Sequence, residues 1–211
     1  MKRQVVCVLC ALGFVLGSTG ARAQSVRDTS FKMENRERVL QQSIVVNASS
    51  KAVWQLISTT EGLRRFAAPR IEFELRPGGL WLSSFNKNAK LDDSGVHNKV
   101  LSYVPGRMLS TQIGFPKEFP ADVRGSETLF DVLMLEPIDA KHTRVVETMS
   151  GFGTGPQWDM TYAMFKECNS QTLEALVLTT KTGKPINWEG KNPYSEHRHP
   201  EGLPLMSGTH Q

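Results

Sequence analysis

The stretch that decides the fold is Ile44–Gly79, IVVNASSKAVWQLISTTEGLRRFAAPRIEFELRPGG. It predicts, in order, a strand, a capped helix, a second short helix, a strand and a tight turn. Ser49 or Ser50 caps a helix over Lys51–Ser58, because a serine side chain accepts a hydrogen bond from the otherwise unpaired amides of the first turn. Pro69 ends the second helix, since proline cannot continue the helical hydrogen bonds. This order is typical of a curved sheet entered by a helix pair.

Alternation of hydrophobic and polar residues predicts strands on both sides of the helix pair. Leu40, Ile44 and Val46 share one face of the first strand, and residues 70–76 alternate cleanly. Further strands are predicted at Leu80–Phe85, Gly95–Val104, Arg107–Ile113, Glu127–Glu136 and Thr143–Met149, followed by one long helix at Gly155–Thr180. The pattern predicts an α+β fold in which the long helix covers the concave face of an antiparallel sheet.

The first residues have the pattern of a secretory signal peptide. A basic start precedes the apolar run Val5–Gly17, and Ala21–Ala23 forms a small-x-small cleavage site. The run is shorter than the roughly 20 apolar residues that span a bilayer. We therefore expect residues 1–23 to be removed and the protein to be exported, to the periplasm or outside the cell. The alternative interpretation is a buried N-terminal helix or a retained anchor.

Removal of this segment changes what the composition implies. Three basic residues and no acidic ones would leave, so the formal net charge falls from +4 to about +1. Nucleic-acid binding, which needs a clustered basic face, loses its support. Cys7 and Cys10 would also leave, so Cys168 is the one cysteine of the mature chain. Such a cysteine on a helix is more often a small buried apolar residue than a nucleophile.

The remaining chain, about 188 residues, is long enough for one domain with a hydrophobic core. Residues 24–37 are polar and predict a flexible leader, and residues 38–182 predict the domain. Residues 183–211 are rich in glycine, proline and polar side chains, which predicts an extended or disordered tail.

Five short motifs, spread over about Arg38–Lys181, carry a resemblance to a known family. They are VVNASSKAVWQLIS, TEGLRRFAAP, ELRPGG, VPGRML and TMSGFG. In their order and spacing the chain resembles the START-like, or Bet v 1-like (SRPBCC), superfamily, and within it the heat-shock-ATPase-activator homologues that are grouped with polyketide cyclases. The resemblance implies a helix-grip fold, with about seven strands around the C-terminal helix and an apolar cavity.

The functions that this resemblance implies are diverse. Members bind lipids, hormones or metabolites, act as cyclases or hydrolases, or assist chaperones. The chain departs from the branch in its signal peptide and its long tail. Export would separate it from a cytosolic chaperone and from ATP, so we do not expect a chaperone-assisting role.

The sequence shows few motifs that would indicate catalysis, cofactor binding or metal binding. The sequence has no nucleophile elbow, P-loop, H-E-x-x-H or dinucleotide fingerprint, and we expect no cofactor. His197 and His199 have the spacing of metal ligands, but they lie in the polar tail. Solvated histidines are the preferred interpretation, and no metal site is expected.

Aromatic residues are the candidates for the lining of a ligand cavity. They are Phe73, Trp81, Phe85, Trp158, Tyr162 and Phe165. Apolar pockets with a few polar groups are the usual ligand sites. The alternative is that these side chains simply fill the core, as aromatic residues in small domains usually do.

Asp131 and Glu147 are candidates for a catalytic acid/base pair. The resemblance implies that Leu133 and Leu135 face inward on one strand and Val145 and Met149 on the next, and strand parity then takes both carboxyl groups inward. A hairpin that pairs Leu135 with Thr143 would place the two side chains directly opposite, with Cβ atoms about 4.5–5.5 Å apart. Repulsion in an apolar cavity would then raise one pKa toward a value useful for proton transfer.

The alternative is a shift of the strand register by one residue, which would turn both carboxyl groups outward. The residues facing inward would then be Phe130, Val132, Met134 and Val146. Hydrophobicity slightly favours this alternative. The loop Gly114–Ser126 also has two interpretations. It could be a lid over the cavity or an ordinary connection between strands.

Three functions follow as hypotheses. The leading one is an exported helix-grip protein that binds a small hydrophobic or amphipathic ligand in an internal cavity. The second is a cyclase- or hydrolase-type enzyme that uses Asp131 and Glu147. The third is a protein-interaction module that works through the C-terminal tail.

Overall fold

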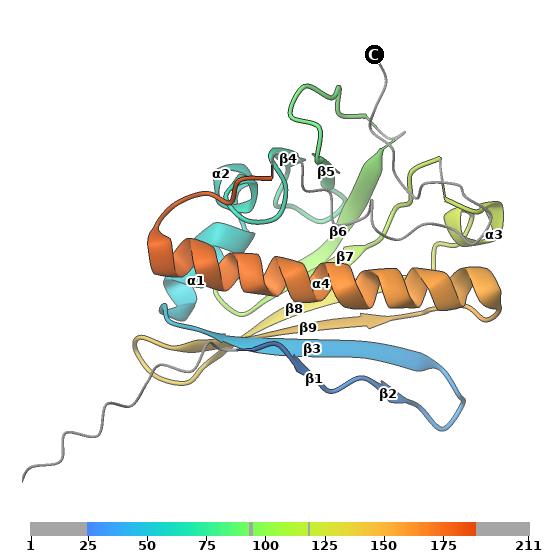
Figure 1. The fold of residues 1–211 in the computed structure, drawn as a ribbon, viewed down its shortest axis with the longest axis horizontal. Helices are drawn as coiled ribbons and strands as arrows, with labels where there is room; N and C mark the ends of the chain where they lie inside the picture. The colour runs from blue at the N-terminus through green and yellow to red at the C-terminus, as the bar shows by residue number, and fades with distance from the viewer. Residues whose placement is uncertain (1–24, 93–94, 118, 189–211) are drawn as a thin grey trace, which may run out of the picture.

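The structure, a computed structural model, describes residues 25–92, 95–117 and 119–188 (Figure 1). Its strands are β1 (Arg27–Asp28), β2 (Phe31–Lys32), β3 (Arg38–Val46), β4 (Arg70–Phe73), β5 (Leu80–Ser84), β6 (Val96–Val104), β7 (Met108–Gln112), β8 (Phe130–Pro137) and β9 (Thr143–Ser150). Its helices are α1 (Ser50–Ile57), α2 (Thr60–Arg64), α3 (Ala121–Arg124) and α4 (Pro156–Thr182). Within the described ranges the nine strands form one antiparallel sheet in the order β1-β3-β9-β8-β7-β6-β5-β4, and β2 also pairs with β3. The predicted α+β fold is confirmed.

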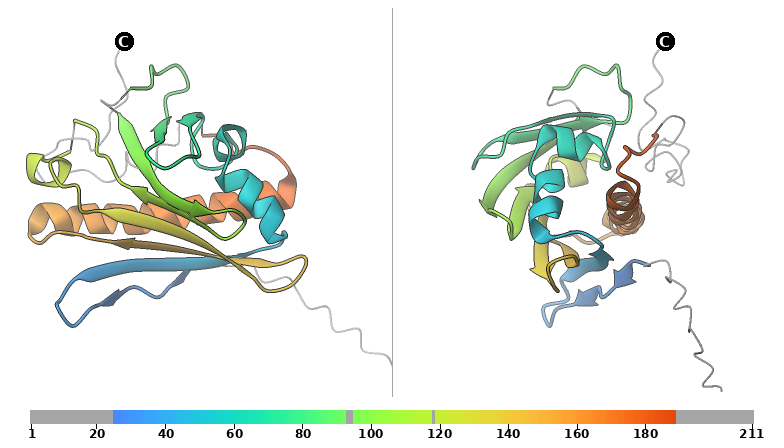
Figure 2. Two further views of the ribbon diagram at one scale, coloured as in Figure 1. Left: turned by 180° about the vertical axis from the view of Figure 1, so that it is seen from behind. Right: turned by 90° about the vertical axis from the view of Figure 1, so that its left-hand side faces the viewer.

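Helix α4 lies across the concave face of the sheet and covers it (Figure 2). Pro156 opens the helix, where its missing N–H leaves no hydrogen bond unmade. Gly183 ends it with a left-handed φ of +67°, a conformation that glycine adopts without steric penalty. Seen end-on in the right panel of Figure 2, the sheet curves around α4. This is the predicted helix-grip arrangement, and strands β3 to β9 are its seven expected strands.

The helix pair after β3 forms as predicted. Ser49 Oγ accepts a hydrogen bond from Ala52 N at 3.3 Å, and Thr59 Oγ1 accepts one from Gly62 N at 3.0 Å. Each bond satisfies an amide that the first helical turn leaves without a backbone acceptor. The apolar side of α1 is buried in the core. The two caps therefore fix where the chain leaves the sheet and where it returns to it.

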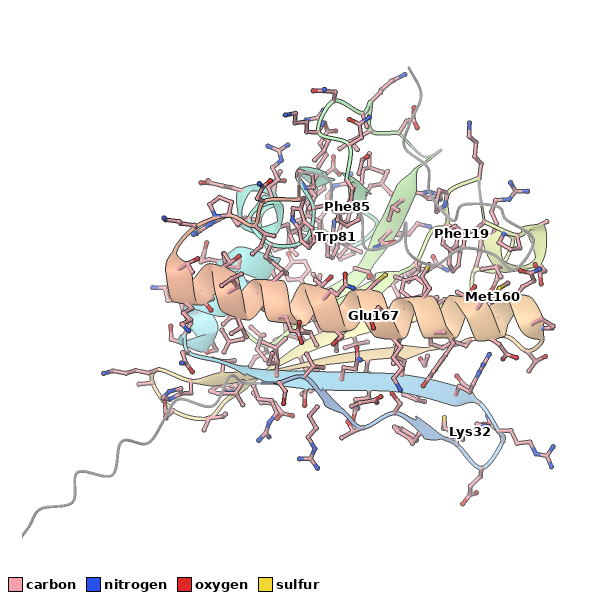
Figure 3. All side chains as sticks on the ribbon, in the orientation of Figure 1. Lys32, Trp81, Phe85, Phe119, Met160 and Glu167 are labelled. Atoms are coloured by element: carbon pink, nitrogen blue, oxygen red, sulfur yellow. The ribbon has the colours of Figure 1, made fainter. Side chains whose placement is uncertain are left out.

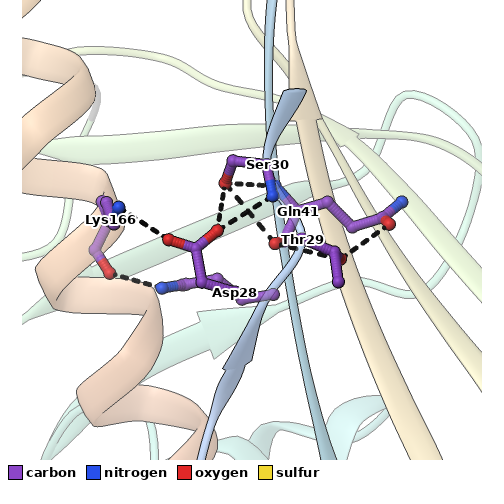
Figure 4. A network of polar contacts seen from close by, with 6 residues as sticks. Asp28, Thr29, Ser30, Gln41 and Lys166 are labelled. Carbon is purple, nitrogen blue, oxygen red and sulfur yellow. Dashed lines mark hydrogen bonds and ion pairs between the residues drawn. The ribbon is translucent and has the colours of Figure 1, made fainter. Parts of the chain in front are cut away.

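Residues 24–37, predicted as a flexible leader, instead contribute β1 and β2 to the sheet edge. Both strands pair with β3, and Asp28 forms an ion pair with Lys166 of α4, Oδ2 to Nζ 2.6 Å (Figure 4). Partial burial raises the pKa of Asp28, but hydrogen bonds from Lys166 and Ser30 lower it more, to about 2. Hydrophobic periodicity missed these strands because their side chains are exposed and only backbone groups pair them.

The chain after α4 starts as an extended segment that packs on the domain. Ile186 N donates a hydrogen bond to Arg65 O at 2.8 Å, and the Arg65 guanidinium donates to Gly183 O at 2.8 Å. The Trp188 ring meets the Phe85 ring edge-on, with centroids 5.4 Å apart. These contacts attach residues 183–188 to the domain near α2 and the end of β5.

Two predictions concern parts of the chain outside the described residues. They are the signal peptide at residues 1–23 and the histidine pair of the tail, His197 and His199, and both stay predictions. Within the described part of the chain, no helix combines the length and the apolar character that crossing a bilayer requires.

The core consists of two hydrophobic clusters arranged along α4. The first joins α1, α2 and the second half of α4, where Leu173 and Leu176 are buried. The second surrounds the first half of α4 and is rich in aromatic side chains, with Trp158 and Phe152 in edge-to-face contact. Cys168 belongs to the second cluster and is buried, as predicted. The middle of α4 lies between the two clusters.

The register of the β8–β9 hairpin differs from the prediction by two residues. Leu135 pairs with Val145, not with Thr143, because the loop is centred one residue later. Asp139 Oδ1 accepts hydrogen bonds from Lys141 N at 2.7 Å and His142 N at 2.8 Å, which holds this longer turn. A shift by two residues keeps the parity, so the same side chains face inward. The one-residue slip is wrong.

Candidate functional site

A cavity of about 90 Å³ lies between the middle of α4 and the concave face of the sheet. It separates the two hydrophobic clusters, because its walls include members of both. The lining residues are Ala67, Ala68, Ile71, Trp81, Ser83, Phe85, Asn98, Ile113, Asp131, Glu147, Met149, Phe165, Asn169 and Thr172. An apolar wall with a few polar groups is the usual composition of a ligand pocket.

Asp131 on β8 and Glu147 on β9 both point into this cavity, as their parity predicted. Each is 9% exposed. The sheet register places Asp131 opposite Met149 and Glu147 opposite Leu133, so the two carboxyl groups are diagonal neighbours and not direct partners. Diagonal side chains on facing strands remain within interaction range. The prediction of a direct pair is corrected, and the prediction of two neighbouring inward carboxyl groups is confirmed.

The environment favours the protonated form of both carboxyl groups. Burial raises the pKa of Asp131 to about 7, although a hydrogen bond from the Val132 backbone opposes the shift. Burial raises the pKa of Glu147 well above its usual range, and the nearby Asp131 carboxylate raises it further. Both causes act in the same direction because a buried charge loses its hydration and two like charges repel. At neutral pH the pair therefore holds at least one proton.

Several buried polar atoms around the cavity have no hydrogen-bond partner among the described residues. Three belong to lining residues: Asp131 Oδ1, Glu147 Oε2 and Trp81 Nε1. Two more, Gln42 Oε1 and Thr111 Oγ1, belong to the direct sheet partners of Glu147 and Asp131. Buried polar atoms are nearly always paired in folded proteins, since an unpaired one costs about 1–3 kcal/mol. These atoms lie on the four neighbouring strands β3, β9, β8 and β7 and on β5.

The polar interior continues onto α4. Asn169 is buried, and its amide Nδ2 donates to Met149 Sδ at 3.1 Å, a weak acceptor. One turn later, Thr172 lines the same cavity. These two residues interrupt the apolar stripe of α4 between Phe165 and Leu173.

The six aromatic candidates divide into two groups. Trp81 of β5, Phe85 directly after β5 and Phe165 of α4 line the cavity, and Figure 3 shows the Trp81 and Phe85 side chains above the middle of α4. Trp158 and Tyr162 pack instead in the second hydrophobic cluster, outside the cavity wall. The remaining candidate, Phe73, contacts Trp81 edge-on, with ring centroids 5.6 Å apart, and supports it from the adjacent strand. Whether any of the six contacts a ligand stays a prediction.

Sequence reasoning missed several residues of the site. Gln42 lies midway between the inward-facing Leu40 and Ile44, so its parity was available as a signal. Asn169 follows Phe165 by one helical turn and precedes Leu173 by one, which places it on the inward face of α4. Both are polar residues at positions where the periodic pattern calls for an apolar one, and this feature of the sequence could have identified them.

The loop at residues 114–126 is part of the core and not an exposed lid. Phe115 and Phe119 are both buried, with ring centroids 4.9 Å apart, and Phe115 also meets Phe165. The loop carries α3 and closes the aromatic cluster at one end of α4. Among the residues that the structure describes, no group of three His, Cys, Asp or Glu side chains could hold a metal ion.

Solved structures of known proteins share this fold. The Aha1 dimer from Colwellia psychrerythraea matches with a TM-score of 0.55 at 18% identity, over 69% of this chain and 98% of that one. CalU16 from Micromonospora echinospora matches with a TM-score of 0.54 at 13% identity, over 77% of this chain and 88% of that one. The Zhui aromatase/cyclase from Streptomyces sp. R1128 matches with a TM-score of 0.51 at 12% identity, over 69% of this chain and 94% of that one. At these identities the likeness shows the fold.

Comparison with curated proteins gives no match. The family described as "Activator of Hsp90 ATPase homolog 1-like protein" matches residues 47–180, which include both short helices and most of α4. Since this range covers more than half of the sequence and agrees with the fold, the chain belongs to the Activator of Hsp90 ATPase homolog 1-like family, within the START-like superfamily.

Proposed function

We propose that this chain is an exported helix-grip protein that binds a small hydrophobic or amphipathic ligand between α4 and the sheet. The observation that carries the proposal is the cavity wall, in which apolar side chains surround buried carboxyl and indole groups without partners. Such groups destabilise the empty protein, and a bound ligand would supply the missing hydrogen bonds. The sequence pattern of residues 1–23 supports the exported location.

The cavity supports a ligand of limited size or the end group of a longer one. Its volume of about 90 Å³ is below the roughly 300 Å³ at which drug-sized pockets begin. Ser83 and Phe85 on its wall are only partly buried, whereas Ile71 is fully buried. A ligand would therefore place its head against the carboxyl pair and extend past β5.

We expect a ligand to accompany the protein through purification from its own host. Native mass spectrometry should show a mass excess over the chain that disappears on denaturation, because a ligand that fills this cavity replaces unpaired polar contacts. A bare chain mass in the native spectrum, together with no saturable change of intrinsic tryptophan fluorescence on adding the host lipid extract, would contradict ligand binding.

A second candidate function is supported by the carboxyl pair. Burial raises the pKa of Asp131 to about 7, near the value at which a group both donates and accepts protons efficiently at neutral pH. A cyclase- or hydrolase-type enzyme of this fold would use Asp131 and Glu147 in those roles. The Zhui protein, described as an aromatase/cyclase, has a related fold.

For this candidate we expect turnover of small aromatic esters that depends on the pair. General acid/base catalysis contributes about 10²–10⁴-fold, so Asp131→Asn and Glu147→Gln should each reduce kcat/KM by at least 100-fold while the melting temperature is kept or raised. Glu136→Gln, an exposed change on β8, is the matched control. Equal turnover in all four proteins would exclude the pair as catalytic groups.

A further inference from the structure

The unpaired atoms of the cavity are mostly hydrogen-bond acceptors. On the sheet side they are Asp131 Oδ1, Glu147 Oε2, Gln42 Oε1 and Thr111 Oγ1. A carboxylate and an amide oxygen only accept hydrogen bonds, and a hydroxyl accepts as well as donates. They come from four adjacent strands, β3, β9, β8 and β7, and converge on one region of the concave face. A ligand that donates several hydrogen bonds would complete them once the carboxyl group that faces it has lost its proton.

In the part of the chain that the structure describes, no positively charged side chain lines the cavity with these acceptors. The described residues that line the cavity include no Lys, Arg or His. Lys166 of α4 is directed away, to Asp28, with its side chain half exposed. The other titratable groups near Glu147 are Cys168 and Glu167 on α4, and burial, followed by the charges of Glu167 and Glu147, raises the pKa of the Cys168 thiol to about 12. Strands β3 and β7 present only the uncharged Gln42 and Thr111 to the pair, and the β5 and β6 residues of the wall are uncharged too.

Aromatic rings form the opposite part of the wall. Trp81, Phe85 and Phe165 line the cavity together with the carboxyl pair. The negative face of an aromatic ring attracts a cation, and tryptophan does so most strongly. The wall therefore combines two acidic groups, neutral acceptors and aromatic rings, which is the environment of a cation site. An anionic ligand would meet two carboxyl groups with no compensating charge.

We propose that the ligand head in this cavity is a protonated amine held against Asp131 and Glu147. This inference rests on the proposed function, that the cavity is a ligand site, and names the chemistry of that ligand. An ammonium group offers three N–H donors, and the sheet side presents four unpaired atoms that can accept a hydrogen bond. The ammonium group enters the cavity in its charged form. The carboxyl group that faces it releases its proton to solvent, and the resulting carboxylate forms a buried ion pair with the ammonium group. Binding is thus coupled to the release of up to one proton.

The test uses three ligands of one shape and different charge: benzylamine, benzyl alcohol and benzoate. Isothermal titration calorimetry on the purified mature chain should give at least tenfold tighter binding of benzylamine than of benzyl alcohol, and no binding of benzoate. Benzylamine affinity should rise from pH 5 to pH 8, and buffers of different ionisation enthalpy should reveal the released proton. Asp131→Asn should weaken benzylamine binding at least tenfold and benzyl alcohol binding much less, whereas Glu136→Gln should change neither.

The outcomes separate this inference from the function on which it rests. If benzyl alcohol binds as tightly as benzylamine, or if Asp131→Asn keeps the wild-type preference for benzylamine, the ligand head is not an amine. The proposal that the cavity is a ligand site is not affected by either result. If none of the three probes binds but the native mass spectrum still shows a host ligand, the amine proposal is wrong and the ligand-site proposal is kept. If none of the probes binds and the native mass is that of the bare chain, both the amine proposal and the ligand-site proposal are wrong.

Discussion

Replacing Asp131 by asparagine is expected to raise the free energy of unfolding at pH 8 by a few kcal/mol, on the order of 4. The ordinary pKa of an aspartate is 3.8, and burial raises that of Asp131 to about 7. Each unit of difference between the folded and unfolded states is worth about 1.4 kcal/mol. Asparagine keeps the shape and carries no charge, so it removes the penalty of burying a carboxylate.

The sign of the pH dependence follows from the raised pKa values. Below about pH 4 the carboxyl groups are protonated in both states and contribute no pH dependence. As the pH rises, the unfolded chain loses these protons while the folded chain keeps them, so wild-type stability falls from pH 4 to about pH 7. Glu147 continues the fall, because its pKa is also raised. The double variant Asp131→Asn/Glu147→Gln should remove this fall.

Denaturant unfolding at several pH values between 4 and 8 measures the effect. The matched control is Glu136→Gln on the same strand, where the carboxylate is exposed and forms a surface ion pair with Arg144. This control should change stability by less than about 1 kcal/mol and keep the wild-type pH slope. A wild-type stability that does not fall over this range, or an Asp131→Asn protein less stable than wild type at pH 8, would show that the carboxyl pair is not buried as described.

The second large effect is expected for Gly151→Ala, which should lower the free energy of unfolding by roughly 3–5 kcal/mol. Gly151 follows β9 with a φ of +89°, and a Cβ atom there would overlap the Thr128 carbonyl oxygen. The contact is with backbone, which cannot rotate away. The Thr128 hydroxyl also donates to Gly151 O at 2.9 Å, so a shift of this turn breaks a second interaction.

Gly183→Ala separates the two causes of that loss. Gly183 also has a positive φ, +67°, but a Cβ atom there meets nothing within 4 Å. Gly183→Ala should therefore lower the free energy of unfolding by only the cost of the left-handed backbone conformation, about 1 kcal/mol. Thermal unfolding should show a decrease in Tm several times larger for Gly151→Ala than for Gly183→Ala. Equal decreases would mean that the close approach of the two backbones is absent.

The sequence left the parity of β8 and β9 open between two alternatives, and the predicted pairing was wrong. Apolar residues occupy both sets of alternate positions in these strands, so the hydrophobic pattern slightly favoured the outward alternative, whereas the structure buries Leu135 and Val145 on the same face as the carboxyl groups. The register depends on how the Asp139 turn folds, and a turn of different length with the same parity satisfies the hydrophobic pattern equally well. The inward direction of the pair therefore came from the family resemblance and not from the hydrophobic pattern.

The composition of the cavity was harder to predict for a physical reason. Helical spacing shows that Trp158, Tyr162 and Phe165 share a face of α4, but not which part of that face meets the cavity. The cavity lies where the stripe becomes polar, at Asn169 and Thr172. The edge strands β1 and β2 escaped prediction because backbone pairing leaves no side-chain pattern.

Two neighbouring serines of β5 allow a test of whether the space between α4 and the sheet is the ligand site. Ser83 lines the cavity, whereas the next residue of β5, Ser84, does not. Successive side chains of a strand point to opposite faces, so Ser83→Phe places a ring in the cavity and Ser84→Phe places one outside. Native mass spectrometry of the host-purified proteins should show the retained ligand in wild type and Ser84→Phe and lose it in Ser83→Phe. Retention of the same ligand by a folded Ser83→Phe protein would contradict the account.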